Sequence, residues 1–100
     1  MPFSYFLPVP RLDSGDASQH PLRMVRHLVA GSTWIEVDTP IAVISAGEAN
    51  YEVLANGPGI LHEFLKEPGS HLSADENIAI IHADGESIPY GKPYSKARRI

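Results

Sequence analysis

Two stretches of this chain match each other without a gap, and this internal repeat limits the folds open to it. Residues 22–44 align with residues 59–81 at five of twenty-three positions, where ordinary composition gives about one or two matches by chance. The identical pairs are Leu28 with Leu65, Asp38 with Asp75, Ile41 with Ile78, Ala42 with Ala79, and Ile44 with Ile81. A duplicated segment favours two similar halves related by a pseudo-twofold axis.

Short apolar runs in and around the repeat predict strands. They are rich in apolar and β-branched residues and are bounded by Gly, Pro, Asn, Asp or Ser. The runs cover residues 24–25, 41–44, 51–54, 60–61 and 78–81. A short helix over residues 61–67 is the alternative there, although Pro68-Gly69 would end it early. Asp84-Gly85 is typical of a type I′ hairpin turn.

Both ends of the chain lack a sustained apolar period. Residues 1–21 contain several prolines and a Ser/Asp/Gly cluster, which indicates an extended N-terminal arm. Residues 85–100 form a basic tail that contains proline and tyrosine, and we expect it to be irregular. The predicted β module therefore spans residues 22–84.

These observations predict a single all-β domain. We expect a flattened β-barrel or sandwich of two small antiparallel sheets with a pseudo-twofold internal repeat, plus irregular N- and C-terminal arms. With 100 residues, the chain has no room for a second domain of ordinary size.

The amino-acid composition indicates the class of protein and excludes some kinds of chemistry. Hydrophobic residues make up 43% of the chain and charged residues 20%, as in ordinary soluble globular proteins. The start of the chain lacks the basic region of a secretory signal, so we expect a cytoplasmic location and no membrane contact. Because there is no cysteine, disulfides, zinc-thiolate sites and thiol nucleophiles are excluded.

Charge is distributed unevenly along the chain. The formal net charge is −4, but the last nine residues carry +4, which leaves −8 on residues 1–91. An acidic body argues against a general nucleic-acid binder. The basic tail is suited to an anionic partner or to the acidic body itself.

Metal and catalytic signatures are weak. The five histidines form no close ligand pair, and we expect no metal site. The chain has no Gly-x-Ser-x-Gly elbow or other organised set of serine, histidine and acid, so we name no catalytic residues and expect no enzyme.

The order of elements in residues 22–84 resembles the lipoyl and biotinyl carrier domains. In that family a hydrophobic strand leads to an Asp-Lys-Ala turn, an alternating strand follows, and a glycine comes shortly after it. Here Gly47-Glu48-Ala49 stands at the Asp-Lys-Ala turn, between residues 41–44 and 51–54, and Gly59 stands at the glycine. The resemblance implies the barrel-sandwich hybrid fold and a place in a 2-oxoacid dehydrogenase- or carboxylase-type system.

The residue at the acceptor position changes what the resemblance implies for function. A glutamate cannot form the amide that joins lipoate or biotin to lysine, so we expect no cofactor at Gly47-Glu48-Ala49. The favoured function is a non-lipoylated module for protein interaction or assembly. The alternative is an acyl or carboxyl carrier modified at another lysine, with Lys66 as the fallback acceptor because it is the only lysine within residues 22–84.

A protein partner is expected at the basic tail. An extended segment with proline and tyrosine beside basic residues can dock in a groove of another protein, such as a component of a multienzyme complex. Packing of the tail on its own module is the alternative. The predicted partner-binding residues are Tyr90, Lys92, Tyr94, Lys96, Arg98 and Arg99.

Overall fold

The computed structural model describes residues 3–12, 21–73, 76–83 and 95–100, and the regular structure in these ranges is entirely β-strand. The strands are β1 Phe3–Pro8, β2 Leu22–His27, β3 Trp34–Ile35, β4 Pro40–Ala46, β5 Ala49–Leu54, β6 Gly59–Phe64, β7 His71–Leu72, β8 Asn77–Ala83 and β9 Lys96–Arg99. The all-β prediction is confirmed. Strand β6 occupies the segment where a helix was the alternative.

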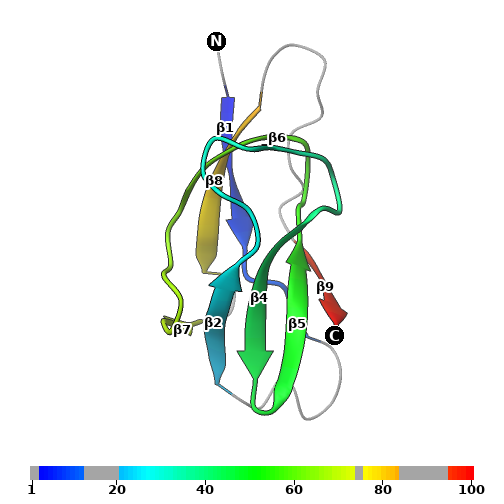
Figure 1. The fold of residues 1–100 in the computed structure, drawn as a ribbon, viewed down its shortest axis with the longest axis vertical. Coiled ribbons are helices and arrows are strands. Elements are labelled where there is room, and N and C mark those ends of the chain that lie inside the picture. Colours follow the sequence, from blue (N-terminus) through cyan, green and yellow to red (C-terminus); the bar gives the residue numbers. More distant parts are fainter. Residues whose placement is uncertain (1–2, 13–20, 74–75, 84–94) are drawn as a thin grey trace.

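The strands form two antiparallel sheets, as expected. The four-stranded sheet has the order β1-β8-β6-β3, and the five-stranded sheet has the order β7-β2-β4-β5-β9. The turn between β4 and β5 lies at one end of the long axis, and the start of β1 lies at the other end (Figure 1).

The internal repeat of the sequence corresponds to a repeat of strands. Strand β2 begins at Leu22 and β6 at Gly59, an offset of 37 positions. The same offset relates β3 to β7 and β4 to β8, and each pair has equal length. Both copies also carry a register irregularity at the same place, between Met24 and Arg26 in one and between Leu61 and Glu63 in the other.

Backbone hydrogen bonds repeat with the same offset and connect the two copies. The N–H of Met24 donates to the carbonyl of Ser70 at 2.9 Å, and the N–H of Gly69 donates to the carbonyl of Met24 at 2.7 Å. Leu61 makes the equivalent bonds, at 2.9 and 2.7 Å, with residues 32–33 of the first copy. Each copy therefore supplies a short strand to the sheet of the other.

The two sheets that the described strands form do not close into a barrel, which corrects that part of the expectation. A barrel needs hydrogen bonds between the outer strands of the two sheets. Strands β3 and β7 have two residues each and offer little to pair with. On the opposite side, Asn56 Nδ2 donates to the carbonyl of Phe6 at 3.0 Å and Ser95 Oγ donates to that of Pro8 at 2.6 Å. These bonds occupy carbonyls that a neighbouring strand would need.

Strands also form in both segments for which irregular arms were expected, so that expectation is wrong for them. Strand β1 pairs with β8 and buries Leu7 completely, while β9 pairs with β5. The reason is long-range: β1 completes the four-stranded sheet, and β9 is held by Ser95 and by an ion pair between Arg98 and Glu52. The Asp84-Gly85 turn lies outside the described residues.

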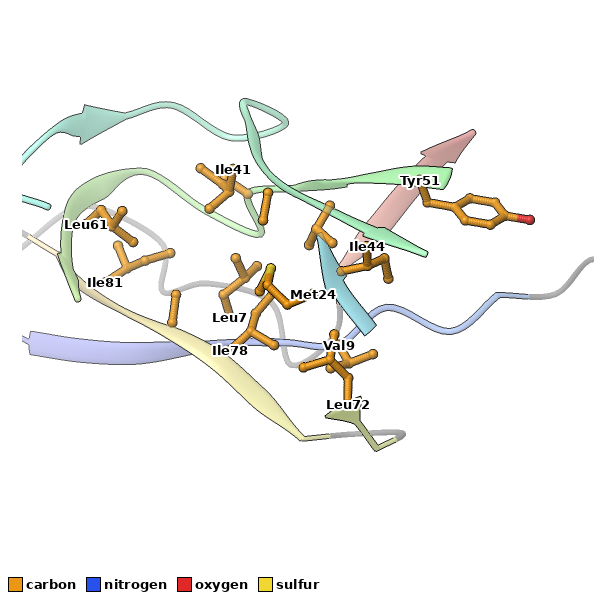
Figure 2. Packing of buried hydrophobic residues seen from close by; sticks show 14 of the residues in the cluster. Leu7, Val9, Met24, Ile41, Ile44, Tyr51, Leu61, Leu72, Ile78 and Ile81 are labelled. Atoms are coloured by element: carbon orange, nitrogen blue, oxygen red, sulfur yellow. The ribbon is translucent and has the colours of Figure 1, made fainter. Parts of the chain in front are cut away.

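Side chains from both sheets meet in one core. The largest fully buried side chains of the four-stranded sheet are Leu7, Ile35, Leu61, Ile78 and Ile81, and those of the five-stranded sheet are Met24, Ile41, Ile44 and Val53. Figure 2 shows several of these side chains converging between the sheets. Burial of each large aliphatic side chain contributes about 1.5–3 kcal/mol before entropy losses.

Gly59 allows the close approach of β6 to β8. Its φ is +149°, and a Cβ there would lie 2.6 Å from the carbonyl oxygen of His82 and 2.7 Å from Cγ2 of Ile81. We expect Gly59→Ala to lower the free energy of unfolding by about 3 kcal/mol, from backbone strain and overpacking. Gly31→Ala is the control, because its Cβ would meet only an ordinary contact at 3.4 Å. Urea unfolding checks both, and equal losses would contradict this role of Gly59.

Tyr5 links β1 to the loop before β6. Its hydroxyl donates to the carbonyl of Pro58 at 2.5 Å, and burial raises the pKa of Tyr5 to about 12. Because this exceeds the unfolded value of about 10, the stabilising contribution is complete below pH 10 and is lost as the pH rises toward 12. We expect wild type to lose stability over this range relative to Tyr5→Phe in urea unfolding. Parallel curves for the two proteins would refute the assignment.

Candidate functional site at the β4–β5 hairpin and strand β9

A two-residue turn joins β4 to β5 at the position of the acceptor turn in the resemblance. Ala46 and Ala49 are cross-strand partners, which leaves Gly47 and Glu48 as the loop. Gly47 has φ of 62°, whereas the non-glycine residues with positive φ in the described ranges are elsewhere. Positive φ at the first loop residue only is the pattern of a type II′ turn, which matches the twist of the strands.

The turn presents an exposed carboxylate on a rigid stem. Gly47 and Glu48 are exposed, while Ala46, Ile44 and Tyr51 below them are buried in the core. A carboxylate here can accept hydrogen bonds or pair with a cation, but it offers no amine for acylation. The site is therefore suited to non-covalent recognition.

Lys66, the fallback acceptor, is already engaged in contacts. It lies in the loop after β6, where its Nζ is 3.1 Å from Oε2 of Glu76 and its side chain is 30% exposed. The hydrogen bond from Lys66 lowers the pKa of Glu76, and a bond to the backbone of Ser73 adds to this effect. Nε2 of His27 donates to the Lys66 carbonyl at 2.8 Å, and the His27 ring stacks on Phe64 at 3.5 Å.

Half of the predicted partner-binding residues lie in β9, and the structure brings them beside the hairpin. Lys96, Arg98 and Arg99 are all exposed. Arg99 is the cross-strand partner of Tyr51, and the N–H of Ile100 donates to the carbonyl of Asn50 at 3.0 Å. The basic strand thus runs along β5 toward the Glu48 turn. Tyr90, Lys92 and Tyr94 lie outside the described residues.

The ion pair on this sheet joins β5 to β9. Nε of Arg98 donates to Oε1 of Glu52 at 2.9 Å, and a second guanidinium nitrogen contacts the same oxygen. The Arg98 side chain is 60% exposed and that of Glu52 only 18%, so the carboxylate is the more shielded partner. This pairing fixes the register of β9 against the hairpin strand.

The outer face of the four-stranded sheet carries a second candidate surface, which the sequence analysis missed. One row crosses all four strands in register: Ser4 on β1, His82 on β8, Ile60 on β6 and Trp34 on β3. Trp34 is 47% and Ile60 40% exposed, and Phe6 nearby on β1 is 52% exposed. Large apolar side chains gathered on one face are typical of interaction surfaces.

Polar contacts order the same row. Ser4 Oγ lies 2.6 Å from Nδ1 of His82, and the rings of His82 and His62 are 4.2 Å apart. Nε1 of Trp34 donates to Oε1 of Glu36 at 2.8 Å. The sequence does contain a sign of strand β1, because outward Ser4 and Phe6 alternate with inward Tyr5 and Leu7. The prolines on either side of this run led instead to the prediction of an irregular arm.

Within the described ranges, no three or more His, Asp or Glu side chains lie close enough together to hold a metal ion. The same ranges contain no helix with the length and apolar character needed to cross a membrane. Comparison of the chain with protein-family models, curated proteins and solved structures finds no match.

The coupling between Glu52 and Arg98 can be measured with a double-mutant cycle. We expect Glu52→Gln, Arg98→Gln and the double variant to give a coupling free energy of about 0.5–1 kcal/mol, since one partner is largely exposed. The coupling should decrease in 1 M NaCl because salt screens exposed charges. A coupling of zero in low salt would show that β9 is held without the ion pair.

Proposed function

We propose that this chain is a non-lipoylated relative of the lipoyl and biotinyl carrier domains and acts as a protein interaction or assembly module. The observation that carries the proposal is the exposed Glu48 at a two-residue turn between paired strands β4 and β5. This is where the resemblance places an acceptor lysine. A projecting turn that carries a carboxylate in place of an amine favours non-covalent recognition of a partner over covalent attachment of a cofactor.

The repeated strands support the resemblance on which the proposal rests. The two copies share strand lengths, one bulge position and a reciprocal set of backbone bonds. A carrier-like barrel-sandwich hybrid has two halves of this kind, as expected from the sequence. The open sheets described above are compatible with the sandwich part of that expectation.

The surroundings of Lys66 favour interaction over a relocated carrier arm. A swinging arm needs a lysine that reaches into solvent from an exposed turn. Lys66 is instead two-thirds covered and paired with Glu76. Its carbonyl is held by His27, which limits the freedom of this loop.

Exposed apolar and aromatic side chains also support a binding role. Trp34, Ile60 and Phe6 lie on one face of a small protein. Aromatic residues are enriched where proteins meet, because they bury much area with little loss of entropy. This face and the hairpin with β9 belong to different sheets, so the module has two surfaces available for assembly.

The first test is the intact mass of the full chain purified from its native host. We expect the mass of the bare polypeptide. An added lipoyl or biotinyl group on any lysine would overturn the proposal in favour of a carrier, and peptide mapping would begin at Lys66.

A second experiment tests the resemblance of the turn itself. We expect purified Glu48→Lys to be lipoylated by a lipoate-protein ligase, because lysine would then occupy the projecting turn. Glu67→Lys is the matched control, since Glu67 is also an exposed acid in a loop. If the ligase modifies neither variant, or both to the same extent, the Gly47-Glu48 turn is not a specific counterpart of the acceptor turn. The hairpin would then no longer support the proposed function.

A further inference from the structure

The outer edges of the two sheets differ in what they leave available for pairing. Strands β3 and β7 are edges of only two residues. Strand β1 is longer, but the carbonyls of Phe6 and Pro8 accept hydrogen bonds from Asn56 and Ser95, and Pro8 has no N–H to donate. Strand β9 ends the five-stranded sheet, and within the described part of the chain its strand neighbour is β5 alone.

The register shows which backbone groups of β9 face away from β5. The N–H of Ile100 donates to the carbonyl of Asn50, so these two residues form a hydrogen-bonded pair. Such pairs recur at every second residue of an antiparallel ladder. Arg98 and Lys96 therefore direct their backbone groups toward β5, whereas Ala97 and Arg99 direct theirs to the other side of β9, where no described strand lies.

The side chains around that edge are basic on one face. Lys96 and Arg98 are exposed on the outer face, beside Leu54 and Glu52 of β5. Ala97 is the partner of the fully buried Val53 and packs against the core. Glu52 offsets the charge of Arg98, which leaves β9 with an excess of positive charge from Lys96 and Arg99.

This charge pattern selects among the strands that could add to the edge. A second copy pairing β9 with β9 would bring Lys96, Arg98 and Arg99 against their equivalents, and like charges placed opposite each other destabilise a sheet. Basic edge residues are a known means of preventing such self-pairing. An acidic strand meets no such obstacle and gains from the same charges.

We propose that β9 binds an extended acidic segment of a partner protein as an additional strand of the five-stranded sheet. The segment has Asp or Glu at alternate positions on the face that Lys96 and Arg98 share, with an apolar residue between them beside Ala97. Lys96 supplies the attracting charge there, and Arg98, which contacts Glu52 through two of its nitrogens, adds N–H donors of its guanidinium. Its backbone bonds to the N–H and carbonyl groups of Ala97 and Arg99, which is recognition by β-augmentation. The inference rests on the proposed role as a protein interaction module and specifies the partner chemistry.

The test uses the full chain and an end-blocked peptide of alternating Glu and Val labelled with a fluorophore. Ala97→Pro removes an outward N–H that β5 does not use, and proline is tolerated on edge strands. We expect this variant to bind at least about tenfold more weakly, from one lost hydrogen bond and an unsatisfied partner. Ala97→Ser keeps the N–H and should stay within about twofold of wild type.

A second measurement uses the wild-type protein, so its result does not depend on whether the proline variant folds. On peptide binding to wild type, the amides of Ala97 and Arg99 should become protected from hydrogen exchange, whereas the amide of Arg98 should already be protected. Lys96→Glu should weaken binding of the Glu/Val peptide.

Three results with this peptide would overturn the proposal. They are absence of binding to wild type, unchanged binding by Ala97→Pro, and equal binding of a peptide with the Glu and Val residues in separate blocks. Equal binding of an oligothymidylate would do so too, because it would indicate attraction of any polyanion.

The proposed function can fail separately from this inference. Tagged wild type and Ala97→Pro are recovered from the native host under mild conditions. A partner held by wild type and lost from Ala97→Pro agrees with strand addition at β9. A partner held equally by both preserves the interaction module but overturns strand addition at β9, and a solitary chain in both overturns the interaction module itself.

Discussion

The fold depends on a reciprocal exchange of backbone hydrogen bonds between its two halves. Met24 bonds to the turn that leads into β7, and Leu61 bonds to the turn that leads into β3. Both residues are also fully buried in the core. Neither half can complete its sheet alone, because each borrows a short strand from the other. The hairpin that carries Glu48 and the edge strand β9 are both built on this shared frame.

The sequence predicted those parts of the fold that local pattern determines. The runs that became β4, β5 and β8 are apolar, β-branched and bounded by turn residues, so local chemistry and packing agree. The two-residue loop at Gly47-Glu48 was visible for the same reason. The structure places the turn where the sequence predicted it and brings Lys96, Arg98 and Arg99 beside it. That these residues bind a partner stays a prediction.

The parts of the fold that the sequence did not predict depend on contacts between residues far apart in the chain. Strand β9 contains no large apolar residue, and its position is stabilised by Glu52 and by the bond from Ser95 to Pro8. Strand β1 ends in a proline, which is compatible with an edge where no N–H is required. The absence of barrel closure follows from side chains of Asn56 and Ser95 that occupy the edge of β1. None of these contacts leaves a periodic signal.

The pairing of β1 with β8 has a consequence for how the protein is made. Tyr5 meets Ile81 in this ladder, so β1 remains without this neighbour until β8 has been translated. Native pairings over such separations slow folding, because a long loop must close before they form. During that interval the apolar residues of β1, including Leu7, are available to other chains. The β4–β5 hairpin meets no such delay, because only two residues separate its paired ends at Ala46 and Ala49.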